Sequence, residues 1–429
     1  MGNTVRAAVD YLQDPHLVRS IQERLGVKRI ATPKTVAGSK SNGGQATEAG
    51  VDHERRRACE GTSANGSVAN AGGALGGGNL RWLATKRRKR LRHPVLAHLS
   101  PISSPEPEDI IVETIPALDI FFKLATELGY EPFYITVLPF LIWNVDTLVT
   151  RHMVVLWIGS MYIGQACKAL WRIRRPASPP AIRLEINPSL ETEYGFPSTH
   201  ATVSTTIPFY AAYRAYLRYN IPLWIGGPLA CLWCGSVCLS RLYLGVHSPL
   251  DLLGGWAVAV VMLIVCIPGL PFFDWLAFDY NYTLIAVPLL VIFLLYIYPV
   301  DPDNWSVDRG DTGAILGSGF GLVLGFHVYG RFPDDIDPGP FELALPSLYV
   351  VGLSIVRFVV GVLLLLPTRF VMKLLCFRLL PLIMPTHGVQ EVVKRPLVEL
   401  PYKIITYGMI GFNAVYLVTY VFEICNISR

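Results

Sequence analysis

The sequence predicts an all-helical protein that crosses a membrane several times. Of its 429 residues, 52% are hydrophobic and only 16% are charged, and the mean hydropathy is +0.40. A soluble domain carries about 25% charged residues, so this composition argues against a soluble enzyme and against a disordered chain. Apolar segments of near-spanning length recur from residue 126 onward. Each suits a membrane-crossing helix of roughly 20 residues.

Residues 1–109 are predicted to form a flexible, glycine-rich and basic cytosolic tail. Arg6–Val27 can form a short amphipathic helix, and Gly43–Gly78 has the composition of a flexible linker. The basic run from Lys86 to Arg90 is typical of a cytosolic flank, and contact with anionic lipid head groups is the alternative. The net charge of +5 is too mild for a dedicated nucleic-acid binder.

Two membrane regions are predicted after the tail, residues 110–270 with the functional motifs and residues 271–429 with further helices. Ile110–Ala125 is apolar but contains charged residues, so it either lies at the interface or adds a crossing. The predicted spans are Thr126–Trp143, His152–Leu170, Ala201–Leu217, Pro222–Leu239, Leu250–Pro268, Tyr282–Val300, Gly313–Val328, Leu348–Leu366 and Ile404–Phe422.

The first group of charged residues lies at the end of a predicted span, in the pattern Lys168-x6-Arg175-Pro176. Seven residues are about two helical turns, so Lys168 and Arg175 share one face if the helix continues. Two cations on one face at a membrane surface attract an anion. The alternative is that both side chains only extend from the end of a span toward the head groups.

The second group, Pro197-Ser198-Thr199-His200, directly precedes an apolar run. A serine before a helix is an ordinary N-cap. The same geometry leaves free N–H groups that bind phosphate, with the hydroxyl of Ser198 as a further donor and Thr199 beside it. His200 would then face the bound anion.

The third group has the pattern Ser240-Arg241-x5-His247-x3-Asp251. A carboxylate four residues after a histidine can orient the imidazole. Ser248-Pro249-Leu250-Asp251 also matches a capping box with proline at the first helical position. Both roles of Asp251 are compatible.

The three groups are more informative together than separately. Each lies at the end of an apolar segment, and two predicted spans separate the second group from the third. An even number of crossings places these groups on the same face of the membrane. The combined pattern resembles the three-part motif of the type 2 phosphatidic-acid phosphatase superfamily, K-x6-RP, PSGH and SR-x5-H-x3-D, with Thr199 where that family usually has glycine.

Within that superfamily the chain most resembles the sphingosine-1-phosphate phosphatases. The shared features include the PSTH sequence and further short stretches, which are Ala177–Pro180, Cys238–Tyr243, Arg309–Thr312 and Glu399–Tyr402. The resemblance runs from about Leu128 to the C-terminus and excludes the glycine-rich tail. It implies a six-helix lipid-phosphatase core with additional C-terminal membrane helices.

The resemblance also implies a role for each residue of the motifs. His247 would attack phosphorus to form a phosphohistidine, Asp251 would hold its other ring nitrogen, and His200 would act as general acid and then as base. The phosphate oxygens would be bound by the remaining residues, Lys168, Arg175, Ser198, Thr199 and Arg241. Three cations occupy the place that a metal would need, so we predict no metal, no cofactor and activity in a chelator.

The expected substrate is a lipid phosphate in the bilayer, and the resemblance narrows it to sphingosine-1-phosphate and related sphingoid base phosphates. Glu185, Glu191 and Glu193 are candidates to bind the sphingoid amine. The alternatives are a lipid phosphotransferase on the same fold, an anion or lipid transporter, and a membrane scaffold with an inactive site.

The resemblance implies a multi-pass protein of the endoplasmic reticulum membrane with its site facing the lumen. By contrast, a cytosolic tail followed by two spans would leave the site in the cytosol. An extra crossing near Ile110–Ala125 would reconcile the two expectations.

Overall fold

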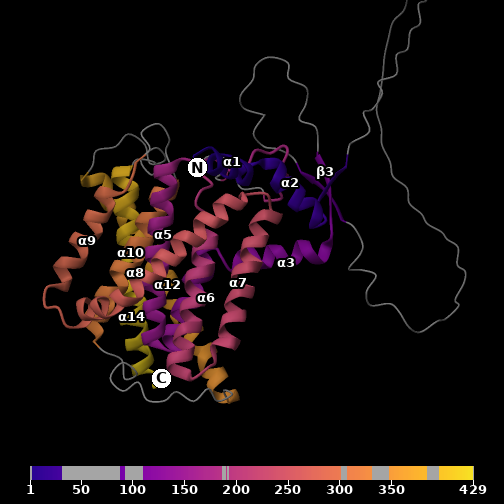
Figure 1. The fold of residues 1–429 in the computed structure, drawn as a ribbon. Helices are drawn as coiled ribbons and strands as arrows, with labels where there is room; N and C mark the ends of the chain where they lie inside the picture. Colours follow the sequence, from indigo (N-terminus) through magenta and orange to yellow (C-terminus); the bar gives the residue numbers. More distant parts are fainter. Residues whose placement is uncertain are drawn as a thin grey trace, which may run out of the picture. The chain divides into compact units, whose positions relative to one another are not determined.

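The computed structural model describes residues 2–30, 87–91, 110–185, 190, 193–300, 307–330, 347–383 and 396–428. Its contacts group into two units, Met1–Lys28 with Ala117–Arg429, and Arg29–Pro116. The larger unit is a bundle of helices (Figure 1). The predicted all-helical membrane fold is confirmed for this unit.

A three-stranded sheet has the order β1-β3-β2 and is formed by Lys28–Ile30, Arg87–Leu91 and Ile110–Thr114. All of these residues except Lys28 fall in the smaller unit. Strands β2 and β3 are antiparallel, with Arg87 opposite Thr114. The predictions for residues 1–109 contained no sheet. The β-branched residues that open Ile110–Thr114 suit a strand.

The segment Ile110–Ala125 does not form a membrane-crossing helix. After β3, the helix α3 covers Pro116–Glu127 with 12 residues. At 1.5 Å per residue it is about 18 Å long, whereas the hydrocarbon core of a bilayer is roughly 30 Å thick. The extra crossing that would place the site and the tail on opposite faces is therefore not supported by α3.

Six helices in the described residues are long and apolar enough to cross a membrane. They are α5 (Thr147–Trp171), α7 (Leu223–Tyr243), α8 (Pro249–Phe278), α10 (Val307–Tyr329), α12 (Leu348–Ile383) and α14 (Pro396–Ile424). Each contains or overlaps one predicted span. Helix α8 continues across residue 270, so the structure has no break at the predicted boundary between the two membrane regions.

Three other predicted spans form shorter or more polar helices. Helices α4 (Glu131–Asn144) and α9 (Thr283–Ile297) have 14 and 15 residues. Helix α6 (Thr199–Tyr219) has 21 residues but is more polar, because its buried face carries hydroxyls such as Thr202 and Ser204. It packs against α5, α7 and α8, where protein rather than lipid meets those hydroxyls.

Helices α10 and α14 approach closely along a row of glycines. Gly313, Gly317, Gly321 and Gly325 recur every four residues on α10, so they share one face. A Cβ on Gly317 would lie 2.7 Å from the carbonyl oxygen of Ile404 on α14. Small residues at this spacing let membrane helices pack backbone to backbone.

We expect the Gly321→Ala substitution to destabilise the bundle by about 1–3 kcal/mol, since overpacking forces backbone shifts. A Cβ on Gly321 would overlap the carbonyl group of Gly408 and lie 2.8 Å from the backbone nitrogen of Phe412. Gly352→Ala on α12 is the matched control, because a Cβ there meets nothing within 4 Å. Thermal unfolding in detergent compares the two, and equal midpoints would contradict this packing account.

The start of the chain differs from the predicted flexible tail. Helices α1 (Gly2–Gln13) and α2 (Pro15–Arg24) belong to the larger unit, with α1 packed on α8 and α2 on α7. Gln22 is fully buried, and its side-chain amide donates to the carbonyls of Ile182 (2.6 Å) and Tyr243 (3.0 Å). Its own oxygen accepts from the Ile182 backbone N–H at 2.9 Å. These hydrogen bonds of Gln22 anchor α2 to the rest of the larger unit.

These anchors place the N-terminal helices at the end of the bundle where α7 ends and α8 begins. In Figure 1 the N-terminus lies at that end and the C-terminus at the other. We therefore expect glycosylation tags at the N-terminus and in the loop between Arg183 and Tyr194 to report the same membrane face. A C-terminal tag should report the opposite face. Opposite results for the first two tags would contradict this arrangement.

Candidate active site

The three sequence motifs meet at one end of the bundle. Lys168 lies in the last turn of α5, His200 in the first turn of α6 and Arg241 in the last turn of α7. His247 follows in the short link to α8, and Asp251 lies in the first turn of that helix. The three motifs therefore lie at the same end of the bundle, as the parity of the predicted spans requires.

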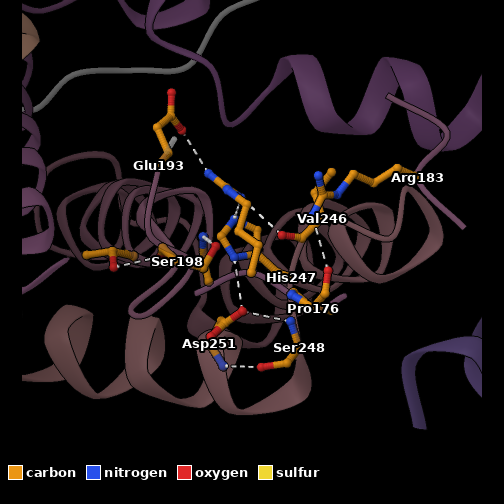
Figure 2. Close-up of polar contacts among 11 residues, drawn as sticks. Pro176, Arg183, Glu193, Ser198, Val246, His247, Ser248 and Asp251 are labelled. Carbon is orange, nitrogen blue, oxygen red and sulfur yellow. Dashed lines mark hydrogen bonds and ion pairs between the residues drawn. The ribbon is translucent and has the colours of Figure 1, made fainter. Parts of the chain in front are cut away.

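Asp251 has both of the contacts expected from the sequence. One carboxylate oxygen, Oδ2, accepts from the Ser248 backbone N–H at 2.7 Å and lies 3.3 Å from Nδ1 of His247. The Ser248 hydroxyl accepts in return from the Asp251 backbone N–H, which completes the capping box. Figure 2 shows the carboxylate touching both partners. The cap therefore fixes the carboxylate that orients the imidazole.

The other ring nitrogen of His247 points toward a guanidinium. Nε2 lies 3.0 Å from NH1 of Arg175, which also donates to the carbonyl of Val246 at 3.0 Å. Because a guanidinium only donates, Nε2 is the acceptor, and the ring proton resides on Nδ1 toward Asp251. Nε2 thus carries the lone pair.

The surroundings of His247 favour the neutral imidazole. The side chain is 1% exposed. Burial, followed by the positive charges of Arg175, Arg241 and Lys168, holds the pKa of His247 well below its usual value of 6.5. A neutral histidine whose lone pair is on Nε2 has the form that a nucleophile needs.

His200 contributes a second ring nitrogen to the site. Its Nε2 is buried and has no hydrogen-bond partner among the described residues. Its ring packs edge to face on Tyr130, with the centroids 4.5 Å apart. A buried ring nitrogen without a partner is unfavourable unless another molecule supplies one, which is consistent with a contact to substrate.

Arg241 is held by residues that the motif analysis did not single out. Its NH1 donates to the hydroxyl of Thr126 at 2.7 Å and to Glu185 at 3.3 Å. Its guanidinium also lies over the ring of Tyr130 at 5.5 Å. Thr126 and Tyr130 were treated only as span residues, because ordinary residue types outside a motif give no sequence signal.

The remaining predicted residues line the same end of the bundle. Ser198 is fully buried and caps α6, with its hydroxyl 3.4 Å from the Ala201 backbone nitrogen, and Thr199 opens the helix. The Ser198 backbone N–H donates to the Asp251 carbonyl at 2.9 Å, which ties the second motif to the third. Lys168 is 4% exposed. All eight predicted site residues are thus gathered here.

Two of the three predicted glutamates lie at this site. Glu193 pairs with NH2 of Arg175 at 2.8 Å, as Figure 2 shows, and Glu185 pairs with Arg241. Glu191 lies outside the described residues. Acidic side chains therefore accompany two of the cations.

No group of three or more histidine, cysteine or carboxylate side chains comes together to hold a metal within the described residues. The cysteines of the Cys231/Cys234 pair differ in environment, since Cys231 is exposed and Cys234 is buried. Cys234 instead packs on α6, 3.0 Å from the hydroxyl of Thr205. The contact assigns helix packing to the Cys234 thiol.

The comparisons with known proteins agree with the motif pattern. The PAP2 superfamily model matches residues 150–274, which contain all three motifs. The chain is 36% identical to sphingosine-1-phosphate phosphatase 1 of Mus musculus over 440 residues, covering 100% of both chains. It is 36% identical to sphingosine-1-phosphate phosphatase 2 of Homo sapiens over 301 residues, covering 68% of this chain and 74% of the relative.

A more distant relative is dihydrosphingosine 1-phosphate phosphatase C823.11 of Schizosaccharomyces pombe, with 27% identity over 216 residues, 49% of this chain and 52% of the relative. No solved structure matches the chain. The full-length similarity and the superfamily match show that the chain belongs to the sphingosine-1-phosphate phosphatases of the PAP2 superfamily, a group of multi-pass lipid phosphate phosphatases.

Proposed function

We propose that this protein hydrolyses sphingosine-1-phosphate and related sphingoid base phosphates to the free base and inorganic phosphate. The observation that carries the proposal is the buried imidazole of His247, held at Nδ1 by Asp251 and surrounded by Lys168, Arg175 and Arg241. The names of its relatives supply the substrate class. The site's place at a helix-bundle end suits a lipid whose head group lies at the membrane surface.

In the first step, Nε2 of His247 attacks phosphorus and the bond from phosphorus to the lipid oxygen breaks. Arg175, Arg241 and Lys168 bind the phosphoryl oxygens, with the N–H groups at the start of α6 and the Ser198 hydroxyl as further donors. His200, which must enter this step as the imidazolium, gives one ring proton to the departing alkoxide and becomes the neutral imidazole. The products of this step are the free lipid alcohol and a phosphohistidine.

In the second step, the oxygen of a water molecule attacks the phosphorus of the phosphohistidine while His200 takes a proton from that water. The bond from phosphorus to Nε2 breaks, which releases inorganic phosphate and restores neutral His247. Asp251 stabilises the positive charge that the ring carries while it is phosphorylated. No step in this sequence requires a metal.

The residues do not identify the membrane in which the protein resides, so the proposed location rests on the family resemblance. We place the protein in the endoplasmic reticulum membrane as a multi-pass protein. Localisation of the tagged full-length chain against an endoplasmic reticulum marker tests this part of the proposal.

The function is tested by phosphate release from sphingosine-1-phosphate by purified protein in detergent with EDTA. We expect equal rates with and without the chelator. A rate that depends on an added divalent ion would overturn the metal-independent mechanism. Transfer of phosphate to an added lipid alcohol, with little free phosphate, would instead identify a phosphotransferase.

The neutral state of His247 also predicts the pH dependence of kcat/KM. Because burial and the nearby cations lower the pKa of His247, protonation of the nucleophile contributes an acid limb to kcat/KM that lies below pH 6.5. The Lys168→Gln substitution removes a nearby positive charge, so it should raise this pKa and move the acid limb to higher pH. Ionisation of the substrate phosphate near pH 6 affects the parent and the Lys168→Gln variant equally, so it does not account for a difference between their profiles. Superimposable acid limbs would contradict the assignment.

A further inference from the structure

Two carboxylates border the proposed site, and they lie next to different catalytic histidines. Glu193 pairs with Arg175, which contacts Nε2 of the proposed nucleophile His247. Glu185 pairs with Arg241 at 3.3 Å and accepts a hydrogen bond from the hydroxyl of Tyr130. The ring of Tyr130 in turn packs on His200. Glu193 is therefore on the nucleophile's side, and Glu185 is on the side of the proposed general acid.

The chemistry of a sphingoid base phosphate makes this difference informative. Its ammonium group is on the carbon next to the one that bears the phosphate ester. The ester oxygen is the leaving group, so the ammonium must lie on the same side as His200. A carboxylate that binds the ammonium group must also lie on the side of His200. It must be able to release its present cationic partner and bind the ammonium group instead.

Glu185 meets these conditions. Its side chain is 18% exposed, whereas the guanidinium partner Arg241 is 1% exposed, so the glutamate is the more accessible member of the pair. Burial raises the pKa of Tyr130, which keeps its phenol protonated and able to donate to the carboxylate. Tyr130 thus holds Glu185 in place when Arg241 turns its donors to the phosphate.

We propose that Glu185 binds the ammonium group of the substrate and gives the enzyme its preference for sphingoid base phosphates over phosphates without an amine. This inference rests on the proposed hydrolase function. Glu193 has a different role, because its partner Arg175 adjoins the attacking nitrogen. It positions a phosphate-binding cation for every substrate alike.

The test compares kcat/KM for sphingosine-1-phosphate and for octadecyl phosphate, a long-chain phosphate without an amine. The parent should prefer the amine by about 10- to 100-fold, the range expected for hydrogen bonds to a charged group. Glu185→Gln should remove most of that preference. The matched variant Glu193→Gln should lower both values and keep their ratio. Glu185→Asp should restore part of the preference.

The outcomes separate this inference from the function on which it rests. A parent that hydrolyses both lipids equally, or a Glu185→Gln variant that keeps the parent's ratio, would overturn the role of Glu185 and leave the hydrolase function standing. A parent that hydrolyses neither lipid would overturn both. Loss of the preference in Glu193→Gln alone would assign the amine to the nucleophile's side and contradict the proposed geometry.

Discussion

We expect the His247→Ala variant to lose at least about 10⁴-fold in kcat for sphingosine-1-phosphate hydrolysis, the scale seen when an enzyme loses its nucleophile. The substitution removes the protein atom that is proposed to bond with phosphorus, and the remaining cations can bind phosphate but cannot replace that bond. Phosphate release under single-turnover conditions measures the loss. A variant that retained a tenth of the parent's rate would exclude His247 as the nucleophile.

His200→Ala is the informative companion, because it should remove proton transfer and keep the nucleophile. We expect a loss of about 10²- to 10⁴-fold on the alkyl phosphate. With an aryl phosphate the leaving group is a phenolate, which departs without protonation by an acid. The rate of the first step should therefore recover in this variant. A burst of phenol matching the enzyme concentration is then expected from His200→Ala and not from His247→Ala. The absence of a burst in both variants would contradict the assigned roles.

The second large effect is on stability and concerns the end of the bundle opposite the site. Arg151 is 1% exposed, and its Nε lies 2.9 Å from Asp274 on α8. The same carboxylate lies 2.9 Å from Nε2 of His152, whose Nδ1 contacts the hydroxyl of Tyr210 at 2.9 Å. We expect Asp274→Ala to lower the free energy of unfolding by about 3–5 kcal/mol, since it removes the carboxylate partner of a buried charge.

Unfolding of the purified protein in detergent measures this effect. Glu23→Ala is the control, because Glu23 is 53% exposed and forms a surface pair with Arg19 at 2.9 Å. A surface pair of this spacing contributes only about 0.3–0.5 kcal/mol. If the free energies of unfolding of Asp274→Ala and of the control differed by less than about 1 kcal/mol, the network would have no major role in holding α5 to α8.

The sequence was most informative where charged residues interrupt apolar segments. Charged residues that adjoin apolar segments are candidates for function, and the parity of the predicted spans places the three distant motifs on one face. The spacing of His247 and Asp251 also predicted both contacts of the carboxylate. The helical membrane fold followed from composition and from the length of the apolar segments.

Other parts of the site depend on tertiary contacts that have no local pattern. Thr126 and Tyr130 reach Arg241 from the α3–α4 region, and neither residue type is unusual there. Gln22 lies in a segment predicted as an amphipathic helix of a flexible tail, yet it is anchored to Ile182 and Tyr243. Burial of one polar side chain against backbone groups 160 and 221 residues away depends on how the bundle packs, not on neighbouring residues.

The most direct test of the mechanism is to trap the covalent intermediate. Radiolabelled lipid phosphate is mixed with the parent protein in EDTA, the reaction is quenched with alkali within one turnover, and the labelled peptide is mapped. We predict label on His247, lost in acid and stable in base as phosphohistidines are, and no label in His247→Ala. Phosphate release without any labelled enzyme, or label on a different residue, would contradict the account.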